Sequence, residues 1–248
     1  MELKLISFNI RCCDDPDGNS IQERAPRLAK ITSEYDADII GFQEYTVPWE
    51  KPVAELYKDY EMFNKYRSVH ELESAPILWK KGKFECLDTG YFWLSDTPEV
   101  ESRGWDELYN CWRMCEYVIL KHIESGKVFT YMNTHYGFGD KGQTDSSRLI
   151  YEYSEKISTN PTIITGDFNM RPNSPGYNEM VKHFTDVNGV TINDRRTTYH
   201  GYGRVDNEHI DYCFINSGVK PLNMKIIDEM VDGKYPTDHY GLYIELEI

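Results

Sequence analysis

Short apolar runs recur along the chain, and each has the length of a β-strand. Polar and turn-forming stretches separate them. The runs predict strands at Leu3–Ile10, Asp38–Phe42, Ala75–Trp79, Tyr117–Leu120, Val128–Asn133, Thr162–Thr165, Ile210–Ile215 and Tyr240–Ile248. Other segments place apolar residues three or four positions apart, which is the spacing of one helix face. They predict helices at Glu23–Tyr35 and Ser146–Ser158.

The alternation of strands and helices predicts a layered α/β fold. The stretches Asp14–Ser20 and Asp96–Asp106 are rich in polar and turn-forming residues, so we expect loops there. The chain has no internal repeat and no Pro/Gly/Ser-rich linker long enough to divide it. We therefore expect one domain over residues 1–248.

The composition limits the class of partner. With 40% apolar and 14% aromatic residues, the chain can bury a sizeable core. Its formal charge of -14 argues against a surface that binds long nucleic acids, because that mode of binding needs clustered Lys and Arg. An anionic substrate stays compatible if a divalent cation and a few side chains supply positive potential in one pocket.

The sequence shows neither a secretory signal nor an apolar stretch long enough to span a membrane, so a cytoplasmic protein is expected. Its six cysteines are then expected to be reduced thiols. Cys111 and Cys115 have the spacing of one helix face or of a zinc pair, but no second Cys/His pair has a matching spacing. A structural zinc site is therefore not predicted.

Four predicted strands end at polar residues whose side chains could act in catalysis or bind a metal ion. Asn9, Glu44, His135 and Asp167 each stand at or just after the end of an apolar run, and Asn169 follows Asp167 by two positions. In an extended chain, residues two apart point to the same side. Taken singly, an Asn in this place is usually a turn residue, and a lone His is more often a satisfied polar group than a catalyst.

Two further positions add to this set, because Asp211 lies within an apolar run and Asp238-His239 stands just before the last predicted strand. If these ends converge on one rim, they supply oxygen ligands for a divalent cation and imidazoles that can meet phosphate oxygens.

Six motifs occur in the order and approximate spacing of the endonuclease/exonuclease/phosphatase superfamily. They are Ser7-Phe8-Asn9, Gly41-Phe42-Gln43-Glu44, Asn133-Thr134-His135, Thr165-Gly166-Asp167-Phe168-Asn169, Ile210-Asp211-Tyr212 and Thr237-Asp238-His239. The chain thus resembles a group that includes pancreatic deoxyribonuclease, repair exonucleases, sphingomyelinases, inositol polyphosphate 5-phosphatases and deadenylases. The resemblance implies a four-layer sandwich, two packed mixed β-sheets flanked by helices, with the site at one end.

The resemblance also implies a Mg²⁺ or Mn²⁺ cofactor, with Glu44 as the main ligand and Asn9 and Asp238 as direct or water-mediated ligands. The two ions accept the same oxygen ligands, so the sequence leaves the choice between them open.

The catalytic roles that the resemblance implies fall on five residues. His239, oriented by Asp211, would stabilise phosphate charge as an imidazolium. Asp167 would orient or deprotonate the attacking water, and Asn169 and His135 would hold the phosphoryl oxygens. Which of Asp167 and His239 acts as the base stays open.

The closest likeness within the superfamily is to bacterial relatives of the deadenylase branch, through the segments Ser102–Asp106, Cys111–Arg113 and Pro172–Tyr177. The candidate substrate contacts are five neighbours of the motifs: Arg113, Tyr136, Trp105, Tyr202 and Arg148. Two enzymatic functions are favoured, a phosphodiesterase acting on short nucleic acid or nucleotides and a phosphatase acting on a small phosphorylated metabolite. A repair-type endonuclease is a less favoured alternative, because such enzymes usually have a basic surface that faces DNA. A non-catalytic binding module is disfavoured because every motif carboxylate and imidazole is present. Tight duplex-DNA or membrane binding is not expected, and the oligomeric state is left open.

Overall fold

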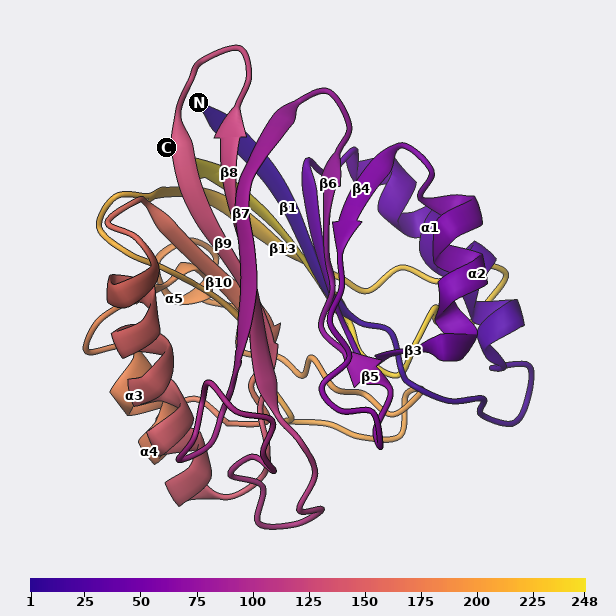
Figure 1. The fold of residues 1–248 in the computed structure, drawn as a ribbon. Coiled ribbons are helices and arrows are strands. Elements are labelled where there is room, and N and C mark those ends of the chain that lie inside the picture. Colours follow the sequence, from indigo (N-terminus) through magenta and orange to yellow (C-terminus); the bar gives the residue numbers. More distant parts are fainter.

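A computed structural model describes residues 1–248 and contains two six-stranded sheets that face each other (Figure 1). The strand order of the first sheet is β13 (Lys220–Ile227), β14 (Gly241–Glu247), β1 (Glu2–Asn9), β2 (Ile39–Gln43), β6 (Ile77–Lys80) and β4 (Tyr60–Phe63). The order of the second is β11 (Thr185–Asp186), β12 (Asp211–Ile215), β10 (Thr162–Asp167), β9 (Val128–His135), β8 (Met114–His122) and β7 (Phe84–Trp93). A separate two-stranded ribbon pairs β3 (Tyr45–Thr46) with β5 (Glu73–Ser74).

Helices cover the outer faces of both sheets. The helices α1 (Ile21–Tyr35) and α2 (Val47–Leu56) lie on the first sheet, and α3 (Asp140–Ile157) and α4 (Pro175–Met180) on the second (Figure 1). The short α5 (Val187–Val190) follows β11. The four-layer α/β sandwich implied by the resemblance is therefore confirmed.

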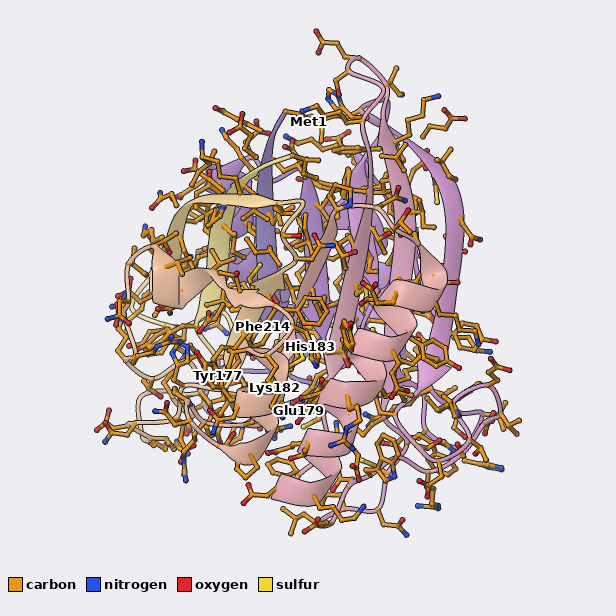
Figure 2. All side chains as sticks on the ribbon, turned by 90° about the vertical axis from the view of Figure 1, so that its left-hand side faces the viewer. Met1, Tyr177, Glu179, Lys182, His183 and Phe214 are labelled. Atoms are coloured by element: carbon orange, nitrogen blue, oxygen red, sulfur yellow. The ribbon has the colours of Figure 1, made fainter.

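Three apolar clusters fill the spaces between the layers. The largest, with 20 buried residues, joins side chains of the two sheets. A cluster of 17 joins the first sheet to α1 and α2, and one of 14 joins the second sheet to its helices. Figure 2 shows α4 over the second sheet, where Tyr177 lies with its ring centroid 6.1 Å from that of Phe214. Each sheet is thus buried on both faces at its centre.

Local signals explain where α1 begins and ends. The Ser20 side chain accepts the backbone N–H of Glu23, and the Glu23 carboxylate accepts the N–H of Ser20, which forms a capping box. The helix ends at Asp36, which adopts a left-handed conformation with φ 48°. The sequence prediction starts this helix at Glu23, two residues after the observed start at Ile21, because it rests on the spacing of apolar residues and not on the capping residue Ser20.

All eight predicted strands are present, and they are the four inner strands of each sheet. The four sheet strands that the prediction missed are the four edges: β13, β4, β11 and β7. Both helices predicted from spacing are present, and the two predicted loops carry no helix. No helix of the structure is long and apolar enough to cross a membrane. All six cysteines are free thiols, as expected.

The pairing of the strands brings their polar ends to one rim. The strands β1 and β2 are parallel, with Asn9 opposite Gln43, and β9 and β10 are parallel, with Asp167 opposite His135. The antiparallel partner β12 places Asp211 opposite Asp167. The termini lie at the other end of the sandwich, where the amino group of Met1 donates to the carbonyl of Ile248 (Figure 1).

Candidate active site

The polar strand ends line a cavity of about 1000 Å³. Glu44, the residue after β2, has a left-handed backbone with φ 60°, and Asn169 has φ 48° two residues after β10. Both residues leave the direction of their strand at this point, and their side chains line the cavity together with Asp167 and His239. The sequence-predicted catalytic set therefore comes together in one place.

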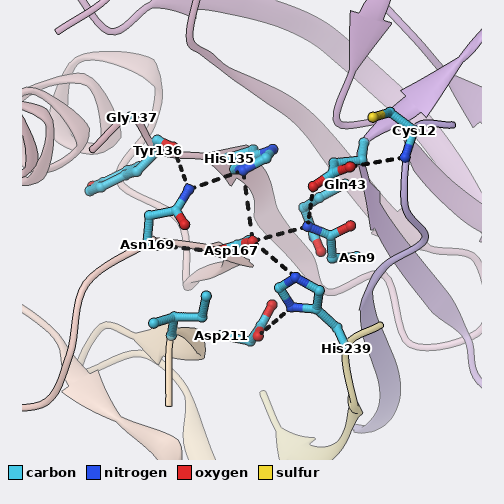
Figure 3. A network of polar contacts seen from close by, with 12 residues as sticks. Asn9, Cys12, Gln43, His135, Tyr136, Gly137, Asp167, Asn169, Asp211 and His239 are labelled. Carbon is cyan, nitrogen blue, oxygen red and sulfur yellow. Dashed lines mark hydrogen bonds and ion pairs between the residues drawn. The ribbon is translucent and has the colours of Figure 1, made fainter. Parts of the chain in front are cut away.

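Asn9 is fully buried and joins two carboxylates. Its amide nitrogen donates to Glu44 Oε1 at 3.0 Å and to Asp167 Oδ2 at 2.9 Å (Figure 3). Ionised carboxylates only accept hydrogen bonds, so the nitrogen must face them. The amide oxygen accepts the backbone N–H of Arg11 at 3.0 Å. This orientation disfavours Asn9 as a direct metal ligand, and it indicates that Asn9 positions Glu44 and Asp167.

His239 and Asp211 form a buried pair. His239 Nδ1 lies 3.0 Å from Asp211 Oδ2, and its Nε2 lies 3.7 Å from Asp167 Oδ2. Burial lowers the pKa of His239, but the charge and hydrogen bond of Asp211 outweigh it and raise that pKa to about 10. The imidazole is therefore cationic at neutral pH, with Nδ1–H directed to Asp211 and Nε2–H directed toward the reaction centre.

His135 has the opposite charge state. Burial and the charge of Arg113 hold the pKa of His135 well below its usual range. The Asn169 amide nitrogen donates to the Tyr136 carbonyl at 2.9 Å and lies 3.1 Å from His135 Nε2, so Nε2 accepts and the proton is on Nδ1. Both amide hydrogens of Asn169 are then in use. Contact of Asn169 with a phosphoryl oxygen would require His135 to release its hydrogen bond.

Glu73 is a site residue that the sequence prediction missed. It lies in β5, and its Oε1 is 3.5 Å from His135 Nδ1, an atom with no hydrogen-bond partner. The pairing of β5 with β3, directly after Glu44, brings Glu73 to the cavity. A two-residue strand has no readable alternation, so no signal in the sequence marked this position.

Asp167 lies at the centre of the site, between the two imidazoles (Figure 3). Its Oδ1 accepts the backbone N–H of Asn169 at 2.9 Å, and its Oδ2 is 3.7 Å from Nε2 of both His135 and His239. Burial and the charge of Asp211 raise the pKa of Asp167. A carboxylate with a raised proton affinity is suited to accept a proton from water.

Two groups of residues could hold a metal ion. Asp167, Asp211 and His239 offer ligand atoms within 4.8 Å of one another. The His239 imidazole, however, is cationic and uses Nδ1 for Asp211, so it is a poor ligand. Glu44 and Asp238 both line the cavity and offer carboxylate oxygens, which are the ligands that hard divalent cations prefer.

One of the five candidate substrate contacts, Arg113, lines the cavity. It is 5% exposed, and its Nε and one terminal nitrogen each lie 3.0 Å from Asp106 Oδ2. The prediction for Tyr136 was wrong. Its side chain is fully buried in the cluster below α3, where the hydroxyl lies 3.5 Å from Ser147 Oγ. The aromatic residue after His135 is part of the core and cannot meet a substrate.

The other three candidates do not line the cavity. Trp105 packs against the cluster below α3. Arg148 lies on α3, where its guanidinium is 3.1 Å from Asp145. Tyr202 donates its hydroxyl to Asp15 Oδ2 at 3.0 Å. These residues are near the motifs in sequence, but their side chains make contacts outside the cavity.

Comparison with known proteins gives the family. Residues 6–239 match the model of the Endonuclease/Exonuclease/phosphatase family. The chain belongs to this family. Its members are phosphoester hydrolases, and the chain is an enzyme of this class. The finer assignment to the deadenylase branch stays a prediction.

Solved structures of the family superimpose on the whole chain. An endonuclease/exonuclease/phosphatase from Bacteroides vulgatus is 27% identical, with a TM-score of 0.91 over 100% of this chain and 99% of that one. A mannosyl-6-phosphatase from Bacteroides thetaiotaomicron is 24% identical, with a TM-score of 0.89 over 99% and 100%. TDP2 of D. rerio, solved with a single-stranded DNA product, is 19% identical, with a TM-score of 0.80 over 100% and 99%.

A curated relative, the uncharacterized protein R895 of Acanthamoeba polyphaga mimivirus, is 24% identical over 245 residues. The match covers 83% of this chain but only 35% of the length of that relative.

Proposed function

We propose that this family member hydrolyses the phosphate monoester of a small polyhydroxylated molecule, with a divalent cation at Glu44 and Asp238. The observation that carries the proposal is the charge pattern of the cavity wall. Five arginines line it. Those outside the cation site are paired with carboxylates, except the exposed Arg103, whose guanidinium donates to the carbonyl of Asn110. The pairs are Arg67 with Glu71 and Glu73, Arg113 with Asp106, and Arg171 with Glu208.

Such a wall suits a neutral leaving group that carries hydroxyls. A hydroxyl both donates and accepts hydrogen bonds, and each arginine–carboxylate pair offers donors beside acceptors. A nucleic-acid backbone would instead need unpaired cations along its path. The overall charge of -14 points the same way. The structural neighbour named as a mannosyl-6-phosphatase supports a phosphorylated sugar as the substrate.

The cation site is supported by the chemistry of its donors. Glu44 and Asp238 are acidic side chains that are 15% and 8% exposed and face the same cavity. Mg²⁺ and Mn²⁺ both accept such oxygens. A bound cation would neutralise charge on the phosphoryl group and on the departing oxygen.

Residues of the chain would accept the proton, stabilise the phosphoryl charge and position the reacting groups. Asp167 accepts a proton from the attacking water, because its proton affinity is raised and its Oδ1 is held by the Asn169 N–H. The His239 imidazolium donates from Nε2 to a phosphoryl oxygen, and Asp211 keeps that ring protonated and oriented. Asn9 donates to both Glu44 and Asp167 and so fixes the two carboxylates relative to each other. This would keep the attacking water aligned with the phosphorus atom.

A substrate panel with Mg²⁺ tests the proposal. Hexose phosphates and p-nitrophenyl phosphate represent monoesters, and bis-p-nitrophenyl phosphate and a short single-stranded oligonucleotide represent diesters. We expect the highest kcat/KM for a sugar phosphate and a lower value for p-nitrophenyl phosphate, which lacks the hydroxyls. Faster turnover of the diesters than of every monoester would contradict the proposal.

Binding of duplex DNA provides an independent check. Fluorescence anisotropy at low salt should show weak binding, because four of the five cavity arginines are paired with carboxylates and the chain is acidic overall. Tight binding with a steep salt dependence would favour a repair-type nuclease.

A further inference from the structure

Arg11 is the one arginine or lysine that forms ion pairs with the two carboxylates of the proposed cation site. Its terminal nitrogen lies 3.9 Å from Glu44 Oε2, and its Nε lies 3.7 Å from Asp238 Oδ2. These distances are too long for hydrogen bonds but short enough for strong electrostatic attraction. The sequence prediction gave this residue no role.

The backbone of Arg11 is held in place from both sides. Its N–H donates to Asn9 Oδ1 at 3.0 Å, and its carbonyl accepts from Trp49 Nε1 at 2.9 Å and from Arg24 at 3.2 Å. The residue has φ 62°, a left-handed conformation that is uncommon for a non-glycine residue. The direction in which the side chain leaves the backbone is therefore determined.

The guanidinium is held as firmly as the backbone. Nε and a terminal nitrogen donate to the two oxygens of Asp15 at 3.0 and 3.3 Å. Asp15 in turn accepts the hydroxyl of Tyr202. Asp15 thus keeps the cation beside Glu44 and Asp238 and prevents it from moving fully onto them.

We propose that Arg11 is a built-in cation that offsets the charge of Glu44 and Asp238 before a divalent ion binds, and that it thereby lowers the affinity of the site for that ion. The inference rests on the cation site of the proposed function. It assigns Asp15 and Tyr202 the task of holding Arg11 at the edge of the site. This also explains why Tyr202 does not face the cavity.

The expected sign follows from Coulomb's law. A fixed positive charge a few ångströms from a divalent ion repels it by roughly 1.4 kcal/mol or more even in the dielectric of water, which is about tenfold in affinity. Removal of the charge should therefore tighten binding of the ion. The same removal should destabilise the metal-free protein, because Glu44 and Asp238 would repel each other without a counter-charge.

The first experiment compares wild type with Arg11→Gln by calorimetric titration of Mg²⁺ and by thermal unfolding in EDTA. We expect the variant to bind Mg²⁺ at least about tenfold more tightly and to unfold at a lower temperature without metal. Arg171→Gln is the matched control, since it removes an arginine of the same cavity that pairs with Glu208 instead. Its Mg²⁺ affinity should stay within about twofold of wild type.

Two further variants keep the test decisive if Arg11→Gln folds poorly. Arg11→Lys retains the charge, so its affinity for Mg²⁺ should remain near that of wild type. Asp15→Asn releases the guanidinium onto Glu44 and Asp238, and this variant should bind Mg²⁺ several-fold more weakly. Opposite effects of Arg11→Gln and Asp15→Asn would not arise from general loss of structure.

The outcomes distinguish an error in the proposed cation site from an error in the proposed role of Arg11. If wild type binds no Mg²⁺, the proposed cation site is wrong, and the role of Arg11 with it. If wild type binds Mg²⁺ and Arg11→Gln binds it equally or more weakly, the cation site stands and the role of Arg11 is overturned.

Discussion

Replacement of Arg24 by methionine should be among the most destabilising single changes in this protein. Arg24 lies on α1, is fully buried, and makes no ion pair with a carboxylate. Its guanidinium donates instead to four backbone carbonyls of the loop between β1 and α1, those of Ile10, Arg11, Cys13 and Asn19. The loop that carries Arg11 is therefore wrapped around one buried side chain.

The size of the effect follows from which carbonyls lose their only donor. The Arg11 carbonyl keeps Trp49, and the Asn19 carbonyl keeps the backbone N–H of Asp15. Those of Ile10 and Cys13 have no other donor within the protein. The Ile10 carbonyl is buried, and a buried unsatisfied carbonyl costs about 1 to 3 kcal/mol, whereas Cys13 is exposed and water can replace the lost donor there. With the smaller losses at the other three carbonyls, Arg24→Met should lower the free energy of unfolding by about 2 to 4 kcal/mol. For a chain of this length that corresponds to roughly 10 °C in Tm.

Urea denaturation of Arg24→Met, Arg24→Lys and Arg27→Met measures the effect. The lysine variant can still donate to some of the carbonyls and should recover part of the loss. Arg27 is one turn further along α1 and donates to a single loop carbonyl, that of Gly18, so its replacement should cost less. A loss below about 1 kcal/mol for Arg24→Met, or an equal loss for Arg27→Met, would refute this reasoning.

Three further predictions concern the site and its surroundings. Glu44→Gln should remove most activity and weaken Mg²⁺ binding while the circular dichroism spectrum stays unchanged; unaltered Mg²⁺ affinity would rule out Glu44 as a ligand. His239→Ala and Asp211→Ala should each lower kcat on the order of a hundredfold, and the double variant should be little worse than His239→Ala, because Asp211 acts through the imidazole; multiplicative losses would exclude this coupling. Burial raises the pKa of Glu116 to about 8, so its contribution to stability is full below pH 4.5 and is lost as pH rises through about 8. Urea unfolding from pH 5 to pH 9 should show a fall of at most about 5 kcal/mol that is absent in Glu116→Gln, and equal slopes for the two proteins would show that Glu116 is ionised throughout.

The strands that the sequence predicted and those it missed differ in their position in the sheet. The inner strands are covered on both faces, so they read as apolar runs. The edge strand β7 is half exposed along its middle, and its sequence mixes Glu85, Asp88 and Thr89 with apolar residues. The opposite sheet has an edge strand, β13, that begins with Lys220 and Pro221, and proline is tolerated in a sheet chiefly at an edge. Edge strands of this kind contain polar residues and do not form apolar runs, so a prediction based on apolar runs misses them.

The candidate site, too, is predictable from the sequence only where buried inner strands carry its residues. Asn9, His135 and Asp167 could be found because strand register places residues at the ends of neighbouring strands side by side, and the apolar runs mark those ends. What these residues do depends on the direction of their hydrogen bonds, which residue type does not give. Asn9 has the oxygen of a metal ligand, yet two neighbouring carboxylates require its nitrogen to face them.

Other charged groups of the site come from loops and short ribbons, which have no periodicity to read. Glu73 is brought in by a two-residue strand, and Arg11 by a loop that closes around Arg24. Acidic side chains gathered at strand ends repel one another, so the fold must supply cations near them. A loop can bring such groups from many places in the sequence, so they must be found in the structure, whereas the cluster of polar residues at the strand ends is predictable from the sequence.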